Sequence, residues 1–89
     1  MSRRYGGALR VADGHLAQAT ALESLHGGLS FAGVCTRVIA PAMHWIGKLW
    51  ERQAITVADE HVATAICHRT LASLYAAVTI QPRDPREMV

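Results

Sequence analysis

Four polar side chains on one face of a predicted C-terminal helix are the residues of this sequence best placed to do chemistry. They comprise a carboxylate, two imidazoles and a hydroxyl: Glu60, His61, Thr64 and His68. At about 100° per residue they share a broad face, predicted to point inward, with Val57, Cys67, Leu71, Leu74, Tyr75 and Val78. Burying such polar groups costs on the order of 1–3 kcal/mol for each lost hydrogen bond. We therefore expect this end of the face to stay open for a ligand, although Glu60 and His61 could instead hydrogen-bond each other or neighbouring helix ends.

An indole is expected at the same end of the molecule. Trp50 lies at the edge of the apolar stripe of the preceding helix, seven residues after Met43, which we also count as a candidate binding residue. If the connection between the helices centres near Ile55, an antiparallel hairpin sets Trp50 level with Glu60. The helical rise of about 1.5 Å per residue keeps His61 within one turn of that height. Such a rim suits a flat or amphipathic ligand stacked on the indole, with its polar edge met by the carboxylate and the imidazole.

The rest of the sequence predicts the elements that position these groups. Glycines, prolines and capping residues divide it into four helical segments, over residues 2–12, 15–26, 30–50 and 56–78. Ser30 is a predicted N-cap, and Thr56 followed by Asp59 resembles a capping box. Asp13-Gly14 is a turn signal, Gly27-Gly28 ends the second helix, and Pro41 is expected to kink or restart the third. With no strand alternation, the sequence predicts an all-α, antiparallel four-helix bundle.

Hydrophobic spacing also predicts which residues the bundle buries. The second helix is expected to bury a stripe that contains Leu16, Ala19, Leu22 and His26. The third is expected to bury Phe31, Val34, Val38, Ala42, Trp45, Ile46 and Leu49. Cys35 and Cys67 should lie about 12 Å apart along the bundle, too far for a disulfide, which needs Cα atoms within about 7 Å. Both cysteines are predicted to be small core residues.

Composition and charge narrow the function classes. Hydrophobic residues make up 51% of the 89 residues and charged residues 18%, which predicts one folded domain. The net charge is +2 and the longest basic run is Arg3-Arg4, so direct nucleic-acid contact is not expected. No stretch approaches the roughly 20 apolar residues that span a bilayer, and none forms the apolar part of a signal peptide. The sequence is therefore interpreted as that of a cytoplasmic domain.

Two segments resemble the helical cap of cobalamin-binding modules. They are IAPAMHWIGKLWE, at residues 39–51, and ITVADEHVATAI, at residues 55–66. The cap precedes a Rossmann-like B12 domain in corrinoid methyltransferase proteins, methionine synthase and adenosylcobalamin photoreceptors of the CarH type. The pattern Trp-x9-Glu-His, filled here by Trp50, Glu60 and His61, is similar to the photoreceptor variant. The resemblance covers roughly residues 5–80.

The resemblance implies a fold, a cofactor and roles for the residues. Residues 1–80 would form the cap and residues 81–89 a linker toward a Rossmann-like B12 domain. The cap would cover the upper axial face of cobalamin, adenosylcobalamin above all, with Trp50 against the upper ligand and Glu60 and His61 at its polar edge. The implied protein is a sensor in transcription regulation and not an enzyme.

The sequence departs from the photoreceptor pattern in two ways. Glu51 stands where those proteins carry a histidine that captures cobalt after light breaks the cobalt–carbon bond. The lower-ligand motif Asp-x-His-x-x-Gly is absent, and so is any βαβ pattern. We therefore expect no bis-histidine photoproduct, and we expect this sequence to be a fragment of a longer protein or a processed one.

Three alternatives remain open at this stage. The first is the cap of a corrinoid methyl carrier, although a methyl group offers nothing for the Glu-His pair to hydrogen-bond. The second is a metal site built from Glu60, His61, Cys67 and His68, which would need three or four converging ligands and lacks the di-iron pattern Glu-x-x-His. The third is a dimerisation domain without a cofactor, for which a predicted exposure of Val62 and Ile66 offers support. Self-association would also be compatible with a cobalamin cap.

Overall fold

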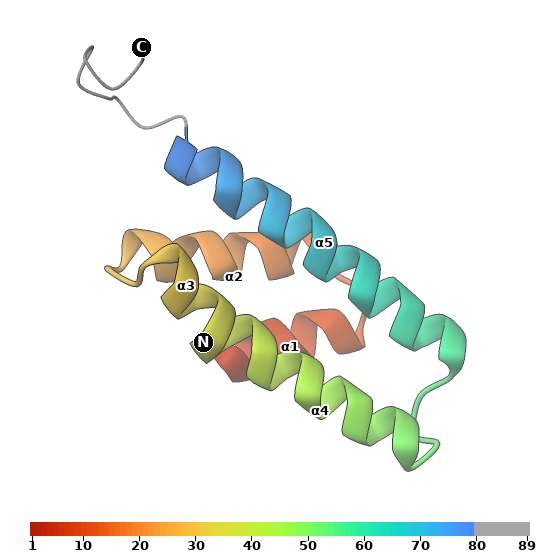
Figure 1. The fold of residues 1–89 in the computed structure, drawn as a ribbon. Helices are drawn as coiled ribbons and strands as arrows, with labels where there is room; N and C mark the ends of the chain where they lie inside the picture. The colour runs from red at the N-terminus through yellow and green to blue at the C-terminus, as the bar shows by residue number, and fades with distance from the viewer. Residues whose placement is uncertain (80–89) are drawn as a thin grey trace, which may run out of the picture.

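The computed structural model describes residues 1–79 and folds them into four antiparallel rods (Figure 1). Two are the short helices α1 (Ser2–Arg10) and α2 (Gly14–His26). The third rod is continuous through α3 (Phe31–Val34), the π-helical turn η1 (Cys35–Ile39) and α4 (Ala40–Glu51). The fourth is α5 (Val57–Thr79). The predicted all-α bundle is confirmed, while the predicted linker at 81–89 lies outside the described residues.

The ends of the helices follow the capping residues predicted from the sequence. The Ser30 hydroxyl accepts from the Gly33 N–H at 3.0 Å, which starts the third rod. At the start of α5 the Thr56 hydroxyl accepts from the Asp59 N–H at 3.1 Å, and the Asp59 carboxylate accepts from the Thr56 N–H at 3.0 Å. These two bonds complete a reciprocal capping box. They also hold the pKa of Asp59 below its usual value, the backbone bond being the larger cause.

Two connections differ in detail from the sequence-based expectation. The predicted turn at Asp13-Gly14 is a helix cap, because the Asp13 carboxylate accepts from the Leu16 N–H at 3.0 Å and α2 begins at Gly14. The first helix ends at Arg10, two residues earlier than predicted, and Ala12 takes a left-handed backbone with φ of 59°. At the other end of α2 the predicted glycine stop is confirmed, with Gly28 at φ of 115°.

Pro41 restarts the third rod without breaking it. The proline occupies the first turn of α4, and the five-residue π-helical turn η1 lies immediately before it. Proline has no N–H to donate, so the regular hydrogen-bond ladder is interrupted here. In this widened turn the Val38 carbonyl accepts from the Ser2 hydroxyl at 3.3 Å. That bond ties the start of α1 to the interrupted part of the rod.

The buried faces of α2 and α5 are rotated from those predicted. On α2 the buried residues are small: Ala17, Thr20, Ala21 and Ser24. Of the predicted stripe, Leu22 packs against the core, whereas Leu16, Ala19 and His26 are exposed. On α5 the buried residues are Ala63, Ile66, Cys67, Thr70 and Leu74, of which Cys67 and Leu74 were predicted, and the predicted Leu71 packs against the core. The third rod buries Val34, Val38, Ala42 and Ile46 as predicted, whereas Trp45 is 43% exposed.

Several individual predictions for α5 are corrected by this rotation. Val57 and Tyr75 are 53% and 64% exposed, although they were expected to point inward. Ile66 is buried, although it was expected on the outer face, whereas Val62 is exposed as predicted. The physical reason is that several positions of the buried faces hold small residues, such as Ala17, Ala21 and Ala63, which a pattern of large apolar residues does not mark. The hydroxyls on these faces remain satisfied because Thr20, Ser24 and Thr70 each donate to the carbonyl four residues earlier.

A tyrosine from α1 fills the centre of the bundle. Tyr5 is fully buried, and its hydroxyl donates to Thr70 Oγ1 at 3.0 Å and lies 3.3 Å from Cys67 Sγ. Burial raises the pKa of Tyr5 well above its ordinary value, and burial likewise raises the pKa of the Cys67 thiol. Both cysteines are free, with Cys67 in the core and Cys35 half-buried.

Candidate functional site

An open hollow of about 510 Å³ lies at the end of the bundle where α4 passes into α5. Its lining residues are Trp50, Glu51, Gln53, Ile55 and Val57. Ile55 is buried, whereas the indole of Trp50 is 48% exposed and Val57 is 53% exposed. Two large apolar side chains thus stand at the surface beside a carboxylate. This combination suits a flat, largely apolar ligand that covers the end of the bundle.

The loop beneath this hollow is fixed by backbone hydrogen bonds. The Gln53 N–H donates to the Trp50 carbonyl at 2.9 Å, and the Ala54 N–H donates to the Leu49 carbonyl at 2.8 Å. Gln53 takes a left-handed backbone with φ of 60°, which turns the chain sharply. The capping box then starts α5 two residues after Ala54. The backbone is therefore held by hydrogen bonds both before and after the turn, and this backbone positions the Trp50 indole.

Glu60 lies in the first turn of α5 and is half-buried. The Thr64 hydroxyl donates to the backbone carbonyl of Glu60 at 3.0 Å and lies 3.4 Å from its carboxylate oxygen Oε1. Thr64 is itself half-buried and is satisfied by its own helix. The polar face is thus partly satisfied by this pair, whereas the alternative expectation was a hydrogen bond between Glu60 and His61. The carboxylate keeps most of its capacity to accept hydrogen bonds from a ligand.

The other predicted site residues have different surroundings. His61 and His68 are exposed, so the inward position predicted for these imidazoles is wrong. Met43 is half-buried and packs against the hydrophobic core. The loop centres one residue earlier than assumed, at about residue 54. Glu60 and His61 therefore lie roughly 3–4.5 Å further along the bundle axis than Trp50, still within one helical turn, but outside the lining of the hollow.

Val57 is the site residue that the sequence analysis missed. It was assigned to the packed face of α5, yet it stands at the surface and lines the hollow with Trp50. The available signal was its position directly after the capping residue Thr56. A large apolar residue in the first turn of a helix, next to a tight loop, is at the end of the bundle where no neighbouring helix covers it.

Metal binding in the bundle core finds no support in residues 1–79. Over this range no group of three or more His, Cys, Asp or Glu side chains is arranged to hold a metal ion. Cys67 is buried in the core, whereas His61 and His68 face solvent, so the side chains of the metal hypothesis do not converge. In the same described residues, no helix is both long enough and apolar enough to cross a membrane.

Comparison with known protein families decides the class of this bundle. Residues 3–75, which extend from the start of α1 nearly to the end of α5, match the model of the B12 binding domain. The chain belongs to the B12 binding domain family. It is a helical, cobalamin-binding cap module, as the sequence resemblance predicted. No curated protein and no solved structure matches the chain.

The exposed groups of this B12 binding domain fit its cofactor. Cobalamin presents a broad, flat corrin with an axial group above it, so a cap must offer apolar surface at one end and accept polar edges nearby. The hollow offers the apolar surface through Trp50 and Val57, which are both about half exposed. Glu60 offers an acceptor for the polar edges. Among the described residues, its carboxylate has only one long contact, from the Thr64 hydroxyl.

Proposed function

We propose that this B12 binding domain covers the upper axial face of adenosylcobalamin within a sensory or regulatory protein. A Rossmann-like domain would hold the corrin from below. The observation that carries the proposal is the exposed indole of Trp50 beside Val57 at one end of the bundle. The Trp-x9-Glu-His pattern of CarH-type photoreceptors supports the same end as the cofactor face.

Each candidate residue has a role that follows from its chemistry. The indole of Trp50 would stack on the adenine or corrin edge, and Val57 would exclude water beside it. Glu60 would accept hydrogen bonds from the ribose hydroxyls, and His61, within a turn of Trp50, would bind the same polar edge. Thr64 would hold the Glu60 side chain along the helix. His68, two turns beyond His61, and the packed Met43 would act at the margin of the site.

The cofactor supplies a weak cobalt–carbon bond when it is bound. The chain shields that bond from water. The position of the bundle over the corrin then depends on whether the upper ligand is present. A ligand shifts such an equilibrium only by its different affinity for the two positions. The adenosyl group would provide that difference because Trp50, Glu60 and His61 lose their partners when it leaves. Glu51, in place of a cobalt-capturing histidine, makes a stable bis-histidine product unexpected.

A titration followed by two-dimensional ¹H–¹⁵N NMR tests the proposal on the 89-residue chain. The two tryptophans give two indole N–H signals, which report separately on the middle of α4 and on its C-terminal end. Adenosylcobalamin added in the dark should shift the Trp50 signal and leave the Trp45 signal in place. Trp50→Ala should weaken binding by roughly tenfold, equivalent to about 1.4 kcal/mol. Trp45→Ala is the matched control, because it removes an indole of similar exposure from the same helix.

Methylcobalamin separates the sensory proposal from the methyl-carrier alternative. A methyl group cannot hydrogen-bond Glu60 or His61. Methylcobalamin should therefore bind more weakly than adenosylcobalamin, and Glu60→Gln should leave the affinity for methylcobalamin unchanged. Equal affinity for the two cofactors would favour the methyl carrier. If the Trp50 signal stays unmoved by either cofactor, or if Trp50→Ala and Trp45→Ala bind alike, the proposed face is wrong.

A further inference from the structure

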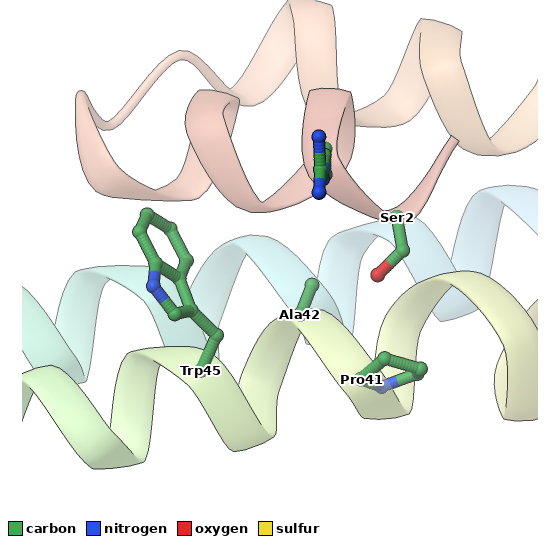
Figure 2. Close-up of a pocket in the computed structure, with 5 residues that line it drawn as sticks. Ser2, Pro41, Ala42 and Trp45 are labelled. Atoms are coloured by element: carbon green, nitrogen blue, oxygen red, sulfur yellow. The ribbon is translucent and has the colours of Figure 1, made fainter.

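A second open pocket, of about 460 Å³, lies between the start of α1 and the start of α4. Its lining residues are Ser2, Arg3, Pro41, Ala42 and Trp45. Figure 2 shows the indole of Trp45 projecting from α4 toward α1, with Ala42 and Pro41 following along the same helix and Ser2 above them. Trp45 and Trp50 are five residues apart, so they are separated by about 140° around the helix. This pocket is therefore distinct from the hollow at Trp50.

The aromatic wall of the pocket is held in place by a glycine. A Cβ added at Gly6 would come within 3.1 Å of Trp45 Cε3 and 3.4 Å of Cζ3, so the indole lies directly on the backbone of α1. Gly6 is itself buried. One part of the indole is thus packed, while the ring as a whole remains 43% exposed. The exposed part presents a fixed aromatic surface to the pocket.

The polar side of the pocket is positive. Arg3 is its one charged lining residue, and α1 carries three arginines and no acidic residue. Arg4, the next residue, is bonded to Glu23 on α2 at 3.4 Å, whereas Arg3 has no ion pair within residues 1–79. The Ser2 hydroxyl already donates to the Val38 carbonyl. Arg3 is therefore the lining side chain whose donors are free for an anion.

We propose that this pocket binds a small aromatic carboxylate. The ring would lie against the indole of Trp45 and the apolar side chains of Pro41 and Ala42, and the carboxylate would pair with the Arg3 guanidinium. Arginine binds carboxylates through two parallel N–H bonds, and flat rings stack on indoles at offset distances. The volume of about 460 Å³ lies within the range of small-molecule sites.

The test uses 2-naphthoate as the probe and the 89-residue chain as the protein. Titration followed by ¹H–¹⁵N NMR should shift the Trp45 indole N–H and the backbone signals of Ser2, Arg3 and Ala42, with the Trp50 signal unmoved. Arg3→Gln should weaken binding about tenfold. Arg10→Gln is the matched control, because it removes the same charge from the far end of the same helix and should weaken binding less than twofold.

Two further probes separate the ring from the charge. 2-Naphthalenemethanol keeps the ring without the charge, and cyclohexanecarboxylate keeps the charge without a flat ring; each should bind at least fivefold more weakly than 2-naphthoate. The proposal is overturned if 2-naphthoate leaves the Trp45 signal in place, or if Arg3→Gln and Arg10→Gln weaken binding equally. Because Trp45 and Trp50 are observed separately, failure here leaves the cobalamin proposal intact, and the reverse also holds.

Discussion

The Tyr5 hydroxyl donates to Thr70 Oγ1 at 3.0 Å, and this bond joins the first helix to the last across the centre of the bundle. Both residues are fully buried. The Thr70 hydroxyl in turn donates to the Ile66 carbonyl at 2.9 Å. A continuous polar path therefore runs from α1 into the backbone of α5. It fixes the height of α1 against α5, and with it the positions of Gly6 and Arg3 beside the pocket at Trp45.

Removing that hydroxyl should measurably weaken the fold. Tyr5→Phe keeps the ring but deletes the bond to Thr70 and the contact with Cys67, so the free energy of unfolding should fall by about 1–2 kcal/mol. Urea unfolding followed by circular dichroism measures the change. Tyr75→Phe is the control, because Tyr75 is 64% exposed on the same α5 and should change stability by less than about 0.5 kcal/mol. Equal effects of the two substitutions would show that the buried bond contributes nothing.

The adjacent glycines of α1 should respond in opposite ways to alanine. At Gly7 an added Cβ meets nothing within 4 Å, so Gly7→Ala should stabilise the helix by about 0.5–1 kcal/mol. At Gly6 the Cβ would press on the Trp45 ring at 3.1 Å, so Gly6→Ala should lose that gain or become destabilising. Thermal unfolding of both variants measures the difference. A Gly6→Ala variant as stable as Gly7→Ala, with an unmoved Trp45 indole signal, would contradict this packing.

The sequence was sufficient for the features that depend on nearby residues. Ser30 and the Thr56–Asp59 pair were predicted as caps because a cap needs only a side chain and an amide three residues away. The same local reasoning placed Trp50 and Glu60 within a turn of each other, because a short loop leaves little choice of register.

The rotation of the helices could not be predicted from hydropathy. Alanine, serine, threonine and cysteine occupy most of the buried faces of α2 and α5, beside Ile66 and Leu74, whereas Leu16, Val57 and Tyr75 are exposed. A pattern that assumes large residues inside therefore misplaces these three residues, although it places Leu74 correctly. The sequence argument relied on a burial penalty for Glu60, His61, Thr64 and His68. The Thr64 hydroxyl is satisfied by the Glu60 carbonyl, and both imidazoles are exposed, so that penalty does not arise.

The capping box at the start of α5 should make stability depend on acid pH. The pKa of folded Asp59 is below its usual value of 3.8, chiefly because its carboxylate accepts the Thr56 N–H. A depressed carboxyl pKa contributes stability above the unfolded pKa, and that contribution is lost as the pH falls through the lower folded value. Melting temperatures should therefore decline below about pH 4, and Asp59→Asn should reduce that decline. Glu51→Gln, at an exposed carboxylate at the end of α4, should leave the decline unchanged; if it flattens the curve equally, the cap is not the cause.

Val57 provides the most selective test of the proposed cofactor face, because it is exposed and its loss should not disturb the core. Val57→Ala removes two methyl groups, worth up to about 1.6 kcal/mol together when fully covered, so adenosylcobalamin binding should weaken by up to roughly fifteenfold. The free energy of unfolding should stay within about 0.5 kcal/mol of the parent chain. Val62→Ala, at an exposed valine on the same helix, should alter neither quantity. Weaker binding in the Val62 variant but not in the Val57 variant would move the cofactor face away from the hollow at Trp50 and onto the outer side of α5.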